Sequence, residues 1–190
     1  MSHGLLELAE RKPDLLVSGI NYGENLSVEV TISGTVGAAL EGAAEAIPAL
    51  AISLAMPISQ HLNGGEMVDY AAAQAYAVRF SRLLLERRMP FDVDVLNVNL
   101  PSDATPETPW RLARLLRRRY FEPTAPERDN GGSARPGYRL MSAPIATEPD
   151  SDVHLLVAQG FVTVTPLSLD MTSRVDFGEL EKLIASSRLV

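Results

Sequence analysis

The chain has 190 residues, and its hydrophobic fraction of 46% is enough for one substantial core, so we expect a single domain. Its formal net charge of −7 argues against dedicated nucleic-acid binding, because nucleic-acid-binding proteins present a net basic surface. The absence of cysteine excludes disulfides, thiolate zinc sites and cysteine nucleophiles. No apolar run is long enough for a membrane span and no signal peptide is visible, so we expect a cytoplasmic protein.

Strand and helix patterns alternate through the first half of the chain. After a helical tail at residues 5–9, we expect strands at 14–18, 50–54 and 93–99, with helices at 34–46 and 66–88 between them. A strand, a helix and a second strand in succession predict two parallel strands joined by a right-handed crossover. The fold class is therefore predicted to be α/β.

The composition changes after residue 101, where proline, serine, threonine and aspartate become frequent. We interpret residues 1–105 as the α/β core and residues 106–190 as C-terminal strands, an arm and a terminal helix within one domain overall. Short strands at 111–115, 138–141 and 161–165 are expected to form a smaller, mostly antiparallel region. An amphipathic helix is expected at 178–189.

The end of the first strand carries the most informative residues. Its apolar run stops at Ser18-Gly19, and polar or small residues follow at Asn21, Gly23 and Asn25. In an open α/β sheet, ligands bind at the carboxyl ends of the strands. This stretch is therefore a candidate binding loop.

The start of the next helix suggests that the ligand is an anion. Ser33 is predicted to cap this helix, and Gly34 and Thr35 leave its first backbone N–H groups unobstructed for a phosphate. A purely structural alternative is that Ser33 only caps the helix and Asn21 only supports a turn.

Five arginines lie close together near residue 115, in a pattern that suggests a strand leading into a basic turn. One interpretation is a solvated edge or a subunit contact. The other is that these guanidinium groups recruit an anionic nucleotide. The five are Arg111, Arg114, Arg117, Arg118 and Arg119.

Four ordered motifs give the chain a family resemblance. They are Val17-Ser18-Gly19-Ile20-Asn21, Ser33-Gly34-Thr35-Val36-Gly37-Ala38-Ala39, Leu96-Asn97-Val98-Asn99-Leu100-Pro101 and Gly160-Phe161-Val162-Thr163-Val164-Thr165-Pro166-Leu167. With these motifs the chain resembles the SurE family, also called survival protein E, from about Leu5 onward. Members are metal-dependent phosphatases that act mainly on nucleoside 5′-monophosphates.

The resemblance implies a Rossmann-like, mostly parallel sheet with helices on both faces, followed by a C-terminal β-hairpin and helix. It implies Mg²⁺ or Mn²⁺ as cofactor, with Asn21 as a metal ligand, and it assigns no certain catalytic residue. It places Gly23, Asn25, Ser33, Gly34 and Thr35 around the substrate phosphate. In similar proteins the C-terminal arm and hairpin exchange between subunits, so a homodimer or homotetramer is implied.

One departure from the family pattern is large. Members begin with a strand that ends in Asn-Asp-Asp-Gly, whose aspartates hold the metal, whereas this chain has no Asp-Asp pair. We expect that roughly the first third of the usual family domain is missing from this chain. A hard divalent cation needs carboxylate oxygens, so we expect metal binding that is weakened or lost and little activity from this chain alone.

Three interpretations follow for the function. The chain is a 5′-nucleotidase that retains the phosphate side of its site, a non-catalytic remnant that binds an anion or nucleotide, or a truncated gene product. A sheet without its N-terminal strand would expose an edge, so we also expect poor solubility or self-association.

Overall fold

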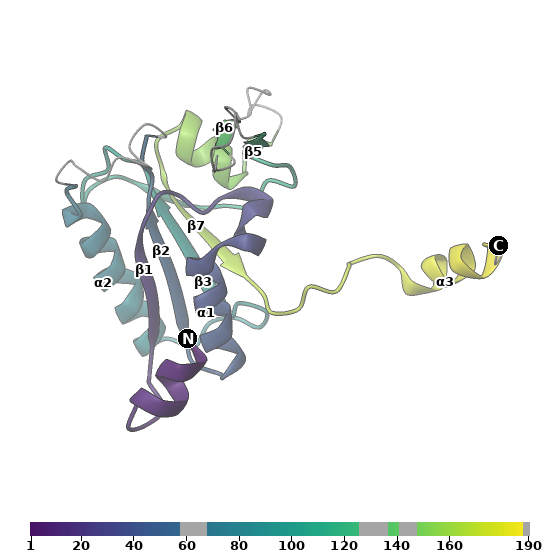
Figure 1. Ribbon diagram of the computed structural model, residues 1–190, viewed down its shortest axis with the longest axis horizontal. Helices are drawn as coiled ribbons and strands as arrows, with labels where there is room; N and C mark the ends of the chain where they lie inside the picture. The colour runs from purple at the N-terminus through teal and green to yellow at the C-terminus, as the bar shows by residue number, and fades with distance from the viewer. Residues whose placement is uncertain (58–67, 126–136, 141–147, 188–190) are drawn as a thin grey trace, which may run out of the picture.

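The computed structural model describes residues 1–57, 68–125, 137–140 and 148–187. Its centre is a five-stranded sheet in the order β1-β2-β3-β7-β4 (Figure 1). Strands β1, β2 and β3 run parallel, β7 is antiparallel to β3, and β4 is parallel to β7. The expected mostly parallel α/β sheet is therefore confirmed. The strands are β1 (Leu16–Tyr22), β2 (Ala49–Leu54), β3 (Val95–Leu100), β4 (Trp110–Leu112) and β7 (Val162–Leu167).

Helices cover both faces of this sheet, as expected. Alternation along β2 explains why: Leu50 and Ile52 pack with helix α2 (Ala71–Glu86), whereas Ala49 and Ala51 face helix α1 (Gly34–Ala44). All six residues of β2 are buried, as are all six of β3. Two hydrophobic cores result, one on each face of the sheet.

Strand β1 is longer than the sequence pattern predicts, since it continues through Gly19 and Asn21 to Tyr22. Its register against β2 shifts between Ser18 and Asn21. Gly19 allows this shift because its φ is +125°, and a Cβ there would lie 2.2 Å from the carbonyl oxygen of Ile52. The polar residues expected in a loop after the strand therefore belong partly to the strand itself.

The expected C-terminal strands are placed differently from the prediction. Instead of joining a separate antiparallel region, β4 and β7 extend the central sheet, and the buried Val162 and Val164 of β7 belong to the core beneath α2. Among the described strands, only β5 (Phe121–Thr124) and β6 (Gly137–Leu140) form a separate antiparallel hairpin. The expected limits of elements at residues 66, 141 and 189 lie outside the described residues.

Three short helices and a terminal helix complete the described chain. The short helices are η1 (Gly4–Leu8), η2 (Ser27–Ile32) and η5 (His154–Ala158). Helix α3 (Phe177–Ser186) extends away from the sheet on an arm and buries none of its residues (Figure 1). Among the described helices, none is long and apolar enough to cross a membrane.

Candidate functional site

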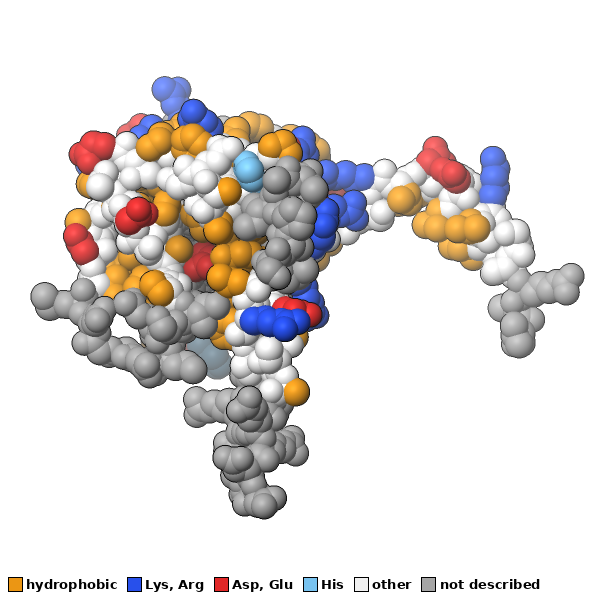
Figure 2. Space-filling view, turned by 90° about the horizontal axis from the view of Figure 1, so that it is seen from above, with side chains coloured by type: hydrophobic (Ala, Val, Ile, Leu, Met, Phe, Trp, Pro, Cys, Tyr) orange, Lys and Arg blue, Asp and Glu red, His pale blue; other side chains and the backbone are white. Residues whose placement is uncertain are grey.

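A cavity of about 590 Å³ lies at the carboxyl end of β1. Figure 2 views the molecule from this end. Four of the six predicted site residues line the cavity, whereas Gly34 and Thr35 begin α1 next to it and are not lining residues. The four are Asn21, Gly23, Asn25 and Ser33.

Asn21 is positioned by the sheet and by its own turn. Its Cα pairs with that of Ser53 on β2, and its Nδ2 donates a hydrogen bond of 2.6 Å to the carbonyl oxygen of Gly23. The amide of Gly23 in turn donates to the carbonyl oxygen of Leu54, and the φ of Gly23 is +107°. The β1 strand therefore ends in a fixed turn that holds the Asn21 carboxamide at the cavity.

Asn25 is engaged by three side chains of neighbouring strands. Its amide donates to Oδ1 of Asn99 at 2.8 Å, and its Nδ2 donates to Oγ of Ser53 at 2.8 Å. Its carbonyl oxygen accepts from Nδ2 of Asn97 and of Asn99. Asn97 and Asn99 thus satisfy loop backbone, and they fix the loop that forms one wall of the cavity.

Ser33 caps helix α1, as predicted. Its Oγ accepts a hydrogen bond from the amide of Val36 at 3.1 Å. The amides of Gly34 and Thr35 precede the first intrahelical bond, so they are the donors that the α1 terminus can offer to an anion.

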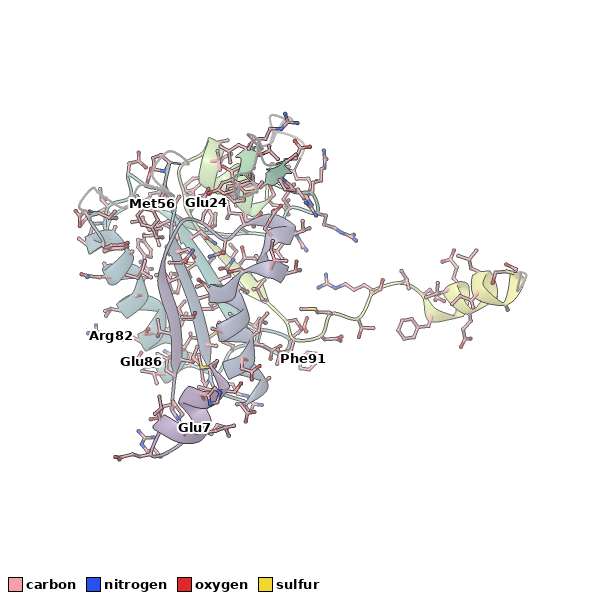
Figure 3. All side chains as sticks on the ribbon, in the orientation of Figure 1. Glu7, Glu24, Met56, Arg82, Glu86 and Phe91 are labelled. Carbon is pink, nitrogen blue, oxygen red and sulfur yellow. The ribbon has the colours of Figure 1, made fainter. Side chains whose placement is uncertain are left out.

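Two carboxylates that sequence reasoning did not single out also line the cavity. Glu24 accepts a hydrogen bond from the amide of Met56 at 3.3 Å, and both residues are labelled in Figure 3. Glu29 accepts from the Ser27 hydroxyl and from the amide of Tyr120 at 3.2 Å. The second carboxylate oxygen of Glu29 is buried and has no hydrogen-bond partner among the described residues.

Different arginines of the cluster fit the two interpretations given above, a solvated surface and a contact with the ligand. Arg114 pairs with Asp150 at 3.1 Å and Arg118 pairs with Glu148 at 3.4 Å, and all four side chains are substantially exposed. Such surface ion pairs contribute little to stability. Arg119, in contrast, lines the cavity.

The β5–β6 hairpin closes the cavity with Phe121 and Tyr138. Phe121 and Tyr138 lie 100 and 117 residues after Asn21, so no local pattern in the sequence indicates their proximity. The pKa of Tyr138 is raised, first by burial and then by the negative charge of Glu24. Glu24 and Tyr138 both line the cavity, so a negative charge lies within electrostatic range of the hairpin.

A buried aspartate joins the loops around the cavity. Asp152 accepts the amide of Ser27 at 2.7 Å on one oxygen, and those of Leu116 and Val153 at 3.0 and 2.9 Å on the other. Burial raises the pKa of this carboxyl, and the N–H donors partly offset that effect. Asp152 thus connects η2 to the segment that leads into the hairpin.

The described residues do not fit a complete divalent metal site. Asn21 offers a neutral carboxamide, and no group of three or more His, Cys, Asp or Glu in the described part of the chain lies close enough to hold an ion. Mg²⁺ or Mn²⁺ needs an oxygen shell with more negative charge than one carboxamide provides.

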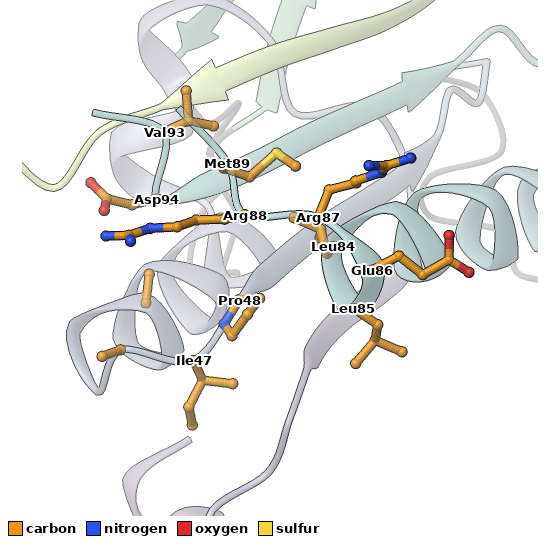
Figure 4. A pocket seen from close by; sticks show the side chains of 12 residues that line it. Ile47, Pro48, Leu84, Leu85, Glu86, Arg87, Arg88, Met89, Val93 and Asp94 are labelled. Atoms are coloured by element: carbon orange, nitrogen blue, oxygen red, sulfur yellow. The ribbon is translucent and has the colours of Figure 1, made fainter. Parts of the chain in front are cut away.

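A second cavity, of about 430 Å³, lies at the opposite end of the sheet (Figure 4). It is lined by the ends of α1 and α2 and by the segment before β3, including Ile47, Leu85, Arg88 and Met89. None of the predicted site residues lines it. The carboxyl end of β1 is therefore the better candidate site.

Comparison with known proteins identifies the family of the chain. A family model described as Survival protein SurE matches residues 1–122. The chain belongs to the SurE family. It is 45% identical over 173 residues to "5'-nucleotidase SurE" of Thermococcus kodakarensis, covering 90% of this chain and 66% of that protein. It is 42% identical over 181 residues to the protein of the same name from Methanocella arvoryzae, covering 93% and 67% respectively.

The SurE fold is also found in a solved structure. The crystal structure of SurE protein from Aquifex aeolicus matches with a TM-score of 0.72 and 28% identity, over 96% of this chain and 70% of that one. The chain spans about two thirds of the length of the SurE relatives that it matches. The family resemblance expected from the sequence is confirmed.

Proposed function

We propose that the cavity at the carboxyl end of β1 is the substrate site of a 5′-nucleotidase that hydrolyses nucleoside 5′-monophosphates to nucleoside and phosphate. The observation that carries this proposal is the convergence of Asn21, Gly23, Asn25 and Ser33 on one cavity in a chain of the SurE family. Two relatives, at 45% and 43% identity, are named "5'-nucleotidase SurE".

The cavity residues and the adjoining start of α1 are suited to orient a phosphate. The α1 terminus presents the amides of Gly34 and Thr35, and the partial positive charge of a helix start favours an anion. Asn21 and Gly23 form the adjacent turn, whereas Asn25 acts by fixing the loop through its bonds to β2 and β3. We therefore assign Asn25 a positioning role within the proposed phosphate site.

Mg²⁺ or Mn²⁺ is the proposed cofactor, with Asn21 as its ligand in this chain. Because the described donors do not complete an oxygen shell, we propose that this chain binds the ion weakly and has low activity. The same observation favours the alternative, a non-catalytic nucleotide-binding protein. The proposed partners are a nucleoside monophosphate and further copies of this chain, as a homodimer or homotetramer, and the proposed location is the cytoplasm.

Phosphate release from a nucleoside 5′-monophosphate, with and without Mn²⁺ or Mg²⁺, tests the proposal. We expect slow release that depends on the ion and falls at least about tenfold in Asn21→Ala, since that variant removes the one assigned ligand. Gln74→Ala, which deletes an exposed carboxamide on α2, is the matched control and should keep full activity.

A separate measurement of nucleotide binding distinguishes the 5′-nucleotidase from the non-catalytic alternative. Folded protein that binds the nucleotide but releases no phosphate under any metal condition would support the non-catalytic alternative. Release that is equal in Asn21→Ala and in the unchanged chain would contradict the role assigned to Asn21.

A further inference from the structure

The hairpin wall of the cavity is aromatic. Phe121 and Tyr138 form an edge-to-face pair, with ring centroids 5.4 Å apart and an interplanar angle of 83°. Phe121 also contacts the ring of Tyr120 at 4.7 Å, and Tyr120 is buried with Leu26 and Val153. The pair is therefore attached to a packed cluster rather than carried on a free loop.

Tyr138 presents part of its ring to the cavity. Its exposed fraction is 37%, and it lines the cavity together with Phe121 and Arg119. An aromatic ring that lines a cavity together with a guanidinium group offers a surface on which a planar, electron-rich ring stacks well.

The rest of the cavity lining includes residues of different chemistry. Asn21, Ser33 and the start of α1 are polar and offer hydrogen-bond donors, whereas the hairpin offers ring faces. A volume of about 590 Å³ lies within the range of small-molecule sites and is large enough for a ligand with a polar end and a flat end.

We propose that Phe121 and Tyr138 form a nucleobase subsite, in which the base stacks on Tyr138 and Phe121 holds that ring in place. The 5′-phosphate of the same ligand lies toward Asn21 and Ser33. This inference rests on the proposed function, since it assumes that the cavity takes a nucleoside monophosphate. It adds that the hairpin selects nucleotides over phosphate esters that carry no base.

Calorimetric binding of three ligands to the full chain tests the subsite: AMP, ribose 5-phosphate, which lacks the base, and adenosine, which lacks the phosphate. We expect AMP to bind at least about tenfold more tightly than ribose 5-phosphate. In Tyr138→Ala the AMP affinity should fall about tenfold, as expected for loss of one stacking contact, while ribose 5-phosphate affinity stays within about twofold.

Three further variants control for folding and for general loss of an aromatic ring. Tyr138→Phe keeps the ring and should retain AMP affinity, while Tyr138→Leu keeps apolar bulk without a ring face and should lose it even if Tyr138→Ala fails to fold. Phe91→Ala removes a ring that is 99% exposed at the opposite end of the molecule, and should change nothing (Figure 3).

The outcomes separate the subsite from the proposed function. If AMP and ribose 5-phosphate bind with equal affinity, and neither Tyr138→Ala nor Tyr138→Leu changes these affinities, the subsite is overturned and the phosphate site stays intact. Adenosine binding that depends on Tyr138, without any ribose 5-phosphate binding, would support the subsite and count against the proposed function. Binding of none of the three ligands would overturn both.

Discussion

At the residue scale, Asp152 determines how the cavity loops are held. In Asp152→Asn one carboxylate oxygen becomes an NH₂ group, which cannot accept the amide of Ser27 or of Leu116. A buried amide without an acceptor costs about 1–3 kcal/mol, so we expect the free energy of unfolding to fall by that amount at neutral pH. Urea denaturation measures it. Asp150→Asn, an exposed carboxyl paired with Arg114, should change it by less than about 1 kcal/mol.

The same residue predicts a pH dependence. Because burial raises the pKa of Asp152 above its ordinary value of 3.8, the folded state holds this proton more tightly than the unfolded state does. Its contribution to stability is therefore greatest below pH 3.8 and declines as the pH rises through the folded-state pKa. The difference in unfolding free energy between the unchanged chain and Asp152→Asn should accordingly shrink from pH 3 to pH 7. A difference that grows over this range would mean that the three N–H donors outweigh burial.

At the element scale, the packing of α1 on β1 depends on Gly42. A Cβ at this position would lie 2.5 Å from Cδ1 and 3.2 Å from Cβ of Leu16. Alanine gains about 1 kcal/mol in helix propensity, but overpacking a core typically costs about 1–3 kcal/mol. We expect Gly42→Ala to lower the free energy of unfolding, measured by thermal or urea denaturation.

Gly37 provides the matched control on the same helix. A Cβ there would meet nothing within 4 Å, so Gly37→Ala should stabilise the protein by up to about 1 kcal/mol. If both variants stabilise the protein equally, α1 does not pack on β1 as closely as these distances indicate.

The sequence predicts a structural feature well where all the residues that determine it lie in one short segment. The Ser33 cap and the strand expected at residues 50–54 follow from a few consecutive residues. The extension of β1 was missed because it depends on a close approach of Gly19 to β2. Phe121 and Tyr138 were missed as cavity residues because only the folded chain brings the hairpin to the end of β1.

At the scale of the whole molecule, the sheet has an edge at β1. In the part of the chain that the structure describes, β1 pairs only with β2, and Val17 on this edge strand is exposed. Unpaired strand edges and exposed apolar side chains favour association. The expectation of poor solubility or self-association therefore stays a prediction with a structural basis.

Helix α3 allows that association to be tested separately from the sheet edge. Phe177, Leu180, Leu183 and Ile184 are all exposed on it, and Figure 2 shows hydrophobic side chains gathered on one side of this detached helix. A helix of 10 residues is only marginally stable in water, even with the Asp176 cap at 2.8 Å, so packing against another chain would stabilise it.

We therefore expect the chain to sediment as a dimer or tetramer, and Leu183→Glu to weaken its association at least about tenfold, because burying one leucine contributes about 1.5–3 kcal/mol. Sedimentation velocity over a range of concentrations measures this effect. Glu181→Gln, on the same helix, should sediment like the unchanged chain. If the unchanged chain is a monomer, association through α3 and association through the β1 edge are both excluded. If Leu183→Glu leaves an oligomer intact, the β1 edge is indicated, since that variant alters only the α3 surface.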